Sequence, residues 1–315
     1  MTVKMNKDIT YSFIIPHKNN PDLLQRCVNS IPRRDDIQIV VVDDNSSIDI
    51  VDWNSFKFDD ERCIELIHTK GCKSAGAVRN EGLKQAKGKW ILFADCDDYY
   101  CDGLLDSLDP FIHSNIEVLF YNIVCLDGIT GEILEPDQSY QKNILNCLTG
   151  KGNYELIRYV KAPWTKMVKK SFLDHYQIFF EDVILGNDVW YSYQIGYFAK
   201  KVALLDKPLY VYTINTNSIS FHRTVAKDVV QIEAYVKQNA FFDFIGHPEW
   251  HVNLPGWIKY HWLKSNHKWQ YALTLLFNAI RIYNTRNKYV VGIEEKKLIG
   301  EAGINTTSQL MGSSF

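Results

Sequence analysis

Short apolar runs alternate with helical patterns over the first 125 residues of the chain. Strands are expected over residues 11–15, 37–42, 63–67, 90–94 and 118–124. Apolar residues at helical spacing lie between some of these runs, over 20–31 and 74–86. Strands separated by helices of this length imply βαβ units and a mostly parallel sheet. The sequence therefore predicts an α/β fold. In the middle of the chain we expect helices at about 153–160 and 187–198, and short strands near 164–168, 201–204 and 209–212.

Three carboxylates follow the fourth apolar run directly. Trp90–Ala94 is followed by Asp95, Asp97 and Asp98. Open α/β sheets bind ligands at the carboxyl ends of their strands, where these charges would gather and repel each other. A divalent cation such as Mg²⁺ or Mn²⁺ would relieve that repulsion, and such ions often attach a diphosphate to protein through one or two carboxylates. An acidic, solvated loop is the alternative interpretation.

Two further polar signals point to the same edge of the sheet. Asp43 and Asp44 end the second strand, where a carboxylate can accept hydrogen bonds from a nucleobase or a ribose hydroxyl. Arg79 lies in the helix of residues 74–86, whose amino end faces that edge, and its guanidinium could pair with a carboxylate or a diphosphate. A turn-forming aspartate pair and a solvent-facing arginine are the alternatives.

Composition narrows the class of protein further. The chain has 315 residues, of which 46% are hydrophobic, and a formal net charge of −2, so no general attraction to nucleic acid is expected. Its first eight residues lack an apolar segment, and no signal peptide is expected. Seven cysteines without a Cys-x-x-Cys spacing argue against a disulfide framework and a zinc knuckle. These features predict a cytoplasmic protein.

Four segments carry a resemblance to a known family. In order, they are Ser12–Leu24, Val40–Ser47, Gly76–Gly82 and Ile91–Asp98. Their order and spacing resemble those of the family 2 glycosyltransferases of the GT-A fold, and the likeness extends more loosely to about residue 223. The resemblance implies a Rossmann-like, mostly parallel sheet flanked by helices, a nucleotide-diphospho-sugar donor that is usually a uridine one, and Mn²⁺ or Mg²⁺.

The same resemblance implies roles for individual residues. Pro16 and Asp44 would line the nucleoside pocket, supported by Arg79, with Asp43 beside them. Asp95 would hold the ribose or the sugar, and Asp97 would ligate the metal. The chain departs from the family at His17 and Lys18, where Thr and Tyr are common. This departure leaves the contacts to the base, and with them the donor, open.

A catalytic carboxylate is expected downstream. The family places Glu-Asp at the start of a helix after a Trp-x-Lys segment, and here Trp164–Lys166 is followed by Asn187 and Asp188. Asp188 would act as the single base of an inverting transfer. The adjacent carboxylates Glu181 and Asp182 compete for this role. A carboxylate that merely stabilises the helix start is the structural alternative for Asp188.

The segment 217–223 resembles the Ser-Ile-Ser/Thr segment that closes many of these catalytic domains. By that match His222 could be an additional metal ligand and Arg223 a diphosphate contact, although a loop histidine at the domain edge is an equal alternative. We place a boundary near residue 223, with a catalytic domain over 1–223 and a helical region over 224–315.

The last 90 residues are rich in Trp, Tyr, His and Lys at helical spacing. These helices are expected to pack on the catalytic domain and to shape the acceptor side. An aromatic and lysine-rich face could instead rest on a membrane surface, which would be the inner face of the membrane for a cytoplasmic protein, or on a partner helix.

The function that this resemblance implies is inverting transfer of a hexose or N-acetylhexosamine from a UDP-sugar. The acceptor would be a glycan or a lipid-linked saccharide in the synthesis of a surface polysaccharide such as capsule, O-antigen or lipopolysaccharide. The alternative is a catalytically inactive, nucleotide-sugar-binding subunit of a glycan-assembly complex, suggested by Asn187. A phospho-receiver domain would carry its acidic pair on the first strand, and a haloacid-dehalogenase phosphatase would need Thr where Tyr99 stands.

Overall fold

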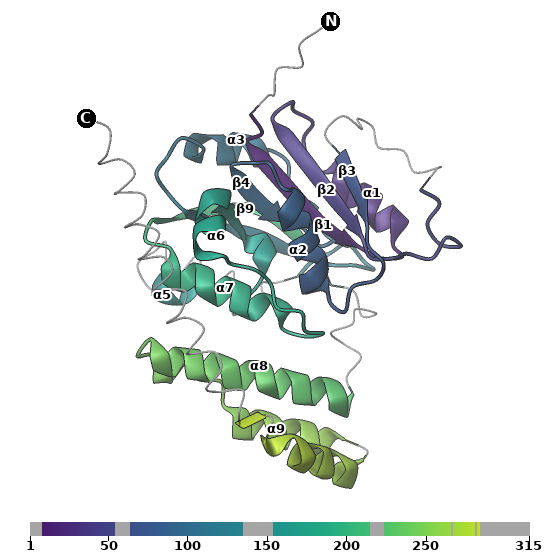
Figure 1. Ribbon diagram of the computed structural model, residues 1–315, viewed down its shortest axis with the longest axis vertical. Coiled ribbons are helices and arrows are strands. Elements are labelled where there is room, and N and C mark those ends of the chain that lie inside the picture. Colours follow the sequence, from purple (N-terminus) through teal and green to yellow (C-terminus); the bar gives the residue numbers. More distant parts are fainter. Residues whose placement is uncertain are drawn as a thin grey trace, which may run out of the picture.

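A computed structural model describes residues 8–53, 64–134, 154–214, 224–265, 267–280 and 282–283. Over these residues the chain forms a nine-stranded sheet in the order β3-β2-β1-β4-β8-β6-β9-β5, with β7 paired to β6 (Figure 1). The strands are β1 Tyr11–His17, β2 Ile37–Asp43, β3 Ile64–His68, β4 Trp90–Phe93, β5 Tyr99–Tyr100, β6 Val118–Asp127, β7 Ile133–Leu134, β8 Lys166–Lys169 and β9 Val202–Ile214.

The path of the chain through the sheet creates a switch point beside β1. Strand β2 pairs with β1, and β3 pairs with the other side of β2. Strand β4 then pairs with the free side of β1, and all three pairings are parallel. The crevice outside the carboxyl ends of β1 and β4 is where open α/β sheets bind ligands. Strand β8 joins β4 to β6 with antiparallel pairing, so the sheet is mixed. The expected α/β class is confirmed.

Helices cover both faces of the sheet, because apolar side chains alternate along the central strands. Ile14 and Val40 face a core that is covered by α2, α6, α7 and α8, whereas Phe13 and Ile39 face a core covered by α1 and α3. The helices of the α/β part are α1 Pro21–Asn29, α2 Ala75–Gln85, α3 Leu104–Leu108, α5 Tyr154–Ile157, α6 Lys170–Tyr176 and α7 Asn187–Phe198.

Two elements of the middle segment differ from the sequence prediction. The two strands expected near 201–204 and 209–212 form one strand, β9, whose pairing with β6 shifts register on either side of Asn122. The shift brings Pro208, which has no N–H to donate, opposite Asn122. The strand expected from Trp164 begins instead with a 3₁₀ turn, Pro163–Thr165, and only β8 enters the sheet.

The carboxy-terminal region is helical over its described residues. Helix α8, Val225–Phe244, is followed by α9, Leu254–Lys264, and by a helix over 268–280. Phe241 of α8 stacks on Tyr193 of α7 with ring centres 4.9 Å apart, so α8 packs on the α/β part as expected. The boundary near residue 223 remains a prediction. Among the described helices, none combines the length and apolar character that a membrane span requires.

Candidate functional site

A cavity of about 770 Å³ lies at the switch point of the sheet. Its wall is built from the ends of β1, β2 and β4, from the first turns of α2 and α7, and from the loops beside them. Six residues singled out in the sequence contribute to this wall: Pro16, Asp44, Arg79, Asp95, Asp97 and Asp188. Segments that are far apart in the chain thus meet at one edge of the sheet.

Arg79 connects two walls of the cavity. Its Nη2 donates to Oδ1 of Asp95 at 2.5 Å, and its Nη1 donates to Oδ1 of Asn187 at 3.1 Å. Burial alone would lower the pKa of this guanidinium, but the Asp95 carboxylate outweighs burial and raises it. The side chain is therefore a fixed cation, and the solvent-facing alternative does not hold. Asp95 keeps 31% of its side chain exposed to the cavity.

Helices α2 and α7 approach closely enough for this bridge because α2 carries Gly76. A Cβ at this position would collide with the carbonyl oxygen of Glu181 and lie 2.8 Å from Cβ of Asn187. Asn80, one turn further along α2, donates from Nδ2 to the carbonyl of Phe180 at 2.9 Å. Gly76, the first glycine of the Gly76–Gly82 motif, thus lets α2 approach the backbone of the segment that leads into α7.

The acidic loop after β4 divides its three carboxylates between two environments. Asp97 lines the cavity, and burial together with the neighbouring Asp95 raises its pKa. Asp98 instead points into the core, where it accepts hydrogen bonds from the Tyr210 hydroxyl at 2.8 Å and from the Thr213 N–H at 2.7 Å. The Tyr210 oxygen also accepts from the Asp95 N–H, so Asp98 anchors the loop.

The two carboxylates on the cavity side fit a divalent cation held jointly with a ligand. Crowding of Asp97 with Asp95 in a partly buried site opposes ionisation, which a cation would favour. Within the described residues, no group of three or more His, Cys, Asp or Glu side chains is arranged to hold a metal. A cation bound through one or two carboxylates plus phosphate oxygens needs no such group. His222 and Arg223 lie outside the described residues.

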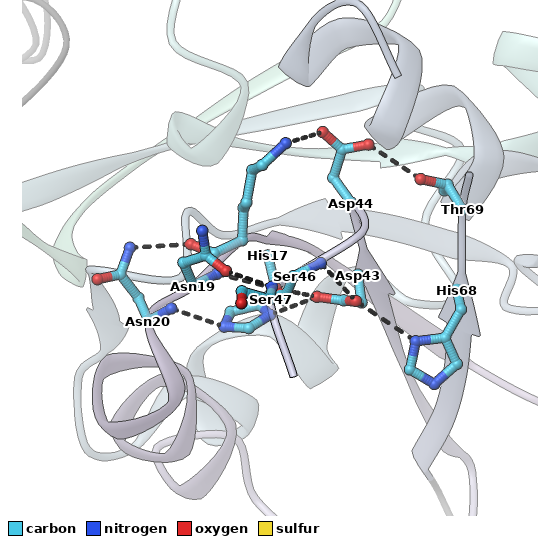
Figure 2. A network of polar contacts seen from close by, with 10 residues as sticks. His17, Asn19, Asn20, Asp43, Asp44, Ser46, Ser47, His68 and Thr69 are labelled. Atoms are coloured by element: carbon cyan, nitrogen blue, oxygen red, sulfur yellow. Dashed lines mark hydrogen bonds and ion pairs between the residues drawn. The ribbon is translucent and has the colours of Figure 1, made fainter. Parts of the chain in front are cut away.

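Asp43 is buried, and its carboxylate accepts hydrogen bonds from neighbouring side chains and backbone (Figure 2). It accepts from Nδ1 of His17 at 3.0 Å, from Ser46, and more distantly from Nδ1 of His68. The Asn20 N–H donates to Nε2 of His17, so Nδ1 carries the proton in a neutral ring. Burial opposes the charge of Asp43, but these hydrogen bonds lower its pKa to about 2.

The Asp44 side chain points away from Asp43 (Figure 2), and it lines the cavity. Its carboxylate is held by Oγ1 of Thr69 at 2.9 Å, by the N–H of Cys72 at 2.5 Å and by Nζ of Lys18 at 3.3 Å. Burial opposes ionisation, yet these donors lower its pKa. The departure at 17–18 thus has a structural reason, because His17 supports Asp43 and Lys18 pairs with Asp44.

Asp188 lies in the first turn of α7 and lines the cavity. Burial raises its pKa, against the opposing charges of Arg79 and Lys161. The competing carboxylates are not among the cavity-lining residues. Glu181 pairs with Nζ of Lys237 on α8 at 2.9 Å, and Asp182 accepts from the Ser74 hydroxyl, which also caps α2.

Sequence reasoning missed two polar side chains of the cavity wall on the side of α7 and α8. Lys161 lines the cavity, and burial lowers its pKa against the attraction of Asp188. Gln231 of α8 also reaches the wall. Neither residue belongs to a motif, and only the packing of distant segments brings them to the site. The segment Trp164–Lys166 could have drawn attention to the neighbouring Lys161.

Comparison with known proteins identifies the family. Residues 12–176 match the family described as Glycosyl transferase family 2, and the chain belongs to that family. This match confirms the family that the four sequence segments predicted.

Two relatives and one solved structure illustrate the likeness. The glycosyltransferase GlyG of Streptococcus pneumoniae serotype 4 is 24% identical over 238 residues, which cover 70% of this chain and 77% of GlyG. The UDP-Glc:alpha-D-GlcNAc-diphosphoundecaprenol beta-1,3-glucosyltransferase WfgD of Escherichia coli is 29% identical over 164 residues. That match covers 50% of this chain and 64% of WfgD, less than two thirds of its length.

The fold is similar to that of TarS of S. aureus, residues 1–349, solved in complex with UDP-GlcNAc. The TM-score is 0.61 at 19% sequence identity, and the match covers 94% of this chain and 92% of that one. At this identity the likeness concerns the fold, and it agrees with the GT-A architecture expected from the motifs.

Proposed function

We propose that this protein is an inverting glycosyltransferase that moves a hexose or N-acetylhexosamine from a UDP-sugar to a glycan or lipid-linked saccharide acceptor. The reaction would belong to the synthesis of a bacterial surface polysaccharide such as capsule, O-antigen or lipopolysaccharide. One observation carries the proposal: the cavity at the switch point gathers Pro16, Asp44, Arg79, Asp95, Asp97 and Asp188.

On this proposal the nucleoside binds between the ends of β1 and β2. Asp44 keeps its charge and can accept a hydrogen bond from an N–H of the base, while Pro16 offers an apolar surface. Asp43 acts indirectly. It accepts hydrogen bonds from His17 and Ser46 and so shapes the loops that border the pocket. Asp95, fixed by Arg79, accepts hydrogen bonds from the ribose or the sugar.

Asp97 is the proposed ligand of Mn²⁺ or Mg²⁺, with Asp95 beside it and His222 as a further candidate. A bound cation would neutralise charge on the departing diphosphate. The protein holds the Asp95–Asp98 loop in place through the hydrogen bonds that Asp98 accepts from β9. Arg79 adds a positive charge beside the same carboxylates.

Asp188 is the proposed general base. An inverting transfer needs one group that takes the proton from the attacking hydroxyl, and no covalent intermediate on the protein. The raised pKa makes this carboxylate a stronger base than an exposed aspartate. Its competitors Glu181 and Asp182 are already engaged by Lys237 and Ser74. We further propose that the protein works in the cytoplasm, at the inner face of the membrane that carries lipid-linked acceptors.

A donor panel tests this function directly. Thermal shift with UDP-, GDP- and ADP-sugars, with and without Mn²⁺, should give stabilisation by UDP-sugars that grows with the metal. Release of UDP in the presence of saccharide acceptors would then establish transfer. Stabilisation by GDP-sugars alone, or by none of the panel, would contradict the proposal.

A second candidate is a catalytically inactive, nucleotide-sugar-binding subunit of a glycan-assembly complex. It is favoured by Asn187, which stands where the family often has Glu. A side-chain amide cannot act as a general base, and here its oxygen accepts a hydrogen bond from Arg79. Binding of a UDP-sugar without UDP release on any acceptor, and no effect of Asp188→Asn, would support this alternative over the transferase.

A further inference from the structure

The helix over residues 268–280 packs one face against the protein. Its opposite, solvent-exposed face also carries large apolar residues. Its inner face carries Tyr271, which is 1% exposed, and the half-buried Thr274, Leu275 and Asn278. Five large apolar residues on the opposite side, here called the outer stripe, are between 50% and 84% exposed. They are Trp269, Leu273, Leu276, Phe277 and Ile280.

The spacing of the outer stripe makes it one continuous surface. Its members follow each other at intervals of four, three, one and three residues, which at 3.6 residues per turn confines them to a sector of about 100°. Scattered exposed apolar residues are normal on a soluble protein, but a contiguous stripe of this kind marks an interaction site. The stripe lies in the carboxy-terminal helical region, which forms one end of the molecule (Figure 1).

The charged residues that lie near the stripe in the sequence indicate what covers it. Between Glu249 and Glu294 the sequence contains no Asp or Glu, although the chain as a whole carries a net charge of −2. The same stretch contains six cationic residues: Lys259, Lys264, Lys268, Arg281, Arg286 and Lys288. A cationic segment with an apolar stripe matches an anionic surface that also offers an apolar interior.

We propose that the outer stripe docks this protein in the interfacial layer of an anionic lipid bilayer. Exposed aromatic residues precede and follow the stripe in the sequence: Tyr260 is 52% and Tyr283 71% exposed, and such side chains favour the boundary between head groups and acyl chains. Lys264 lies 4.5 Å from the ring centre of Tyr260, so aromatic and cationic groups are presented together. At about 1.5 Å per residue the helix is far too short to span a bilayer and would lie in its plane.

This inference deepens the proposed function, since it would hold the protein where a lipid-linked acceptor is found. It is tested without donor or acceptor. The full chain is sedimented with vesicles of phosphatidylcholine, alone or mixed with phosphatidylglycerol. Binding should be strong with phosphatidylglycerol, weak without it, and reduced by salt, because the charges lie near the surface.

Matched variants locate the contact. The double variant Trp269→Ser/Phe277→Ser should lower the partition coefficient at least about tenfold, because it removes two large apolar groups that the bilayer would bury. Lys264→Glu/Lys268→Glu should abolish the preference for phosphatidylglycerol. Ile129→Ser, which changes an equally exposed apolar residue (78%) between β6 and β7, should bind like the unaltered protein.

Equal binding of the double variant and the unaltered protein, or no binding to phosphatidylglycerol vesicles, would overturn the inference. So would a dimer by light scattering that Trp269→Ser/Phe277→Ser converts to a monomer, since the stripe would then serve a second copy of the chain. If the unaltered protein releases UDP but does not bind the vesicles, only this inference fails. UDP release that never occurs, with vesicle binding intact, would count against the proposed function only.

Discussion

The guanidinium of Arg79 donates to the carboxylate of Asp95 over 2.5 Å, although the two residues belong to different elements, α2 and the loop after β4. The pair is partly buried, and the same guanidinium reaches Asn187 on α7. One side chain thereby sets the distance between the acidic loop and the helix that carries Asp188. The geometry of the proposed donor and base sites is therefore coupled through Arg79.

Asp188→Asn should reduce turnover at least about a hundredfold, because loss of a general base typically costs about 10²–10⁴-fold in rate. Binding of a UDP-sugar should change little, since the base contacts the acceptor. Steady-state kinetics and calorimetry separate the two effects. Asp182→Asn, which changes an exposed neighbour held by Ser74, is the control and should stay active. If instead Asp182→Asn or Glu181→Gln is inactive and Asp188→Asn is not, the base lies upstream.

The pH profile gives an independent test of the same residue. A base acts when it is deprotonated, and burial raises the pKa of Asp188 above that of an ordinary aspartate. Turnover should therefore fall as the pH decreases through this raised value, while donor binding persists. An acid limb that survives unchanged in Asp188→Glu at the same pH, or that is missing, would contradict the assignment.

Asp97→Ala should remove the stimulation of donor binding and transfer by Mn²⁺. The expectation follows from its place on the cavity wall beside Asp95 and from the hard oxygen ligands that such ions prefer. Titration of Mn²⁺ with and without a chelator measures the effect. The exposed Asp102, just past the loop, supplies the control Asp102→Ala. Full activity of the unaltered protein in chelator would show that no metal is needed.

Asp44→Ala should weaken UDP binding by roughly tenfold or more, because a hydrogen bond to a charged acceptor contributes about 1.5–3 kcal/mol. Competition among free nucleotides should rank UDP above GDP and ADP. The exposed Asp49→Ala should leave that ranking and the affinity for UDP unchanged. A clear preference for GDP would mean that the base pocket has been misassigned.

Asp43→Asn should reduce stability rather than remove a direct ligand contact. The folded pKa of Asp43 is about 2 against an ordinary value of 3.8. A lowered pKa contributes stability above the unfolded value, and this contribution is lost as the pH falls from about 4 to about 2. The shift corresponds to about 2 kcal/mol at neutral pH.

Urea unfolding at several pH values measures this contribution. The unaltered protein should lose it between about pH 4 and pH 2, and Asp43→Asn should lack that part of the pH dependence. The exposed Asp106→Asn on α3 is the control. If Asp43→Asn were as stable as the control and bound UDP more weakly, Asp43 would be a ligand contact instead.

Periodicity in the sequence was sufficient to predict most of the central elements. The runs at 37–42 and 90–94 form β2 and β4, and α7 spans Asn187–Phe198 as its pattern predicts. The motifs also placed Asp44, Asp95 and Asp97 at strand ends, and these residues meet at one cavity. Such predictions succeed because alternation of apolar residues and helix caps act locally, within one element.

The sequence by itself determined which residues end the strands and so stand at the binding edge of the sheet. Only the tertiary structure decided which of them face the cavity. Asp43 and Asp44 are adjacent, yet His17, 26 residues earlier, holds the first in the core. Asp98 is held by Tyr210, 112 residues later, while Asp97 stays on the cavity wall. A carboxylate is buried where distant donors compensate its desolvation, and no local pattern records where those donors will be.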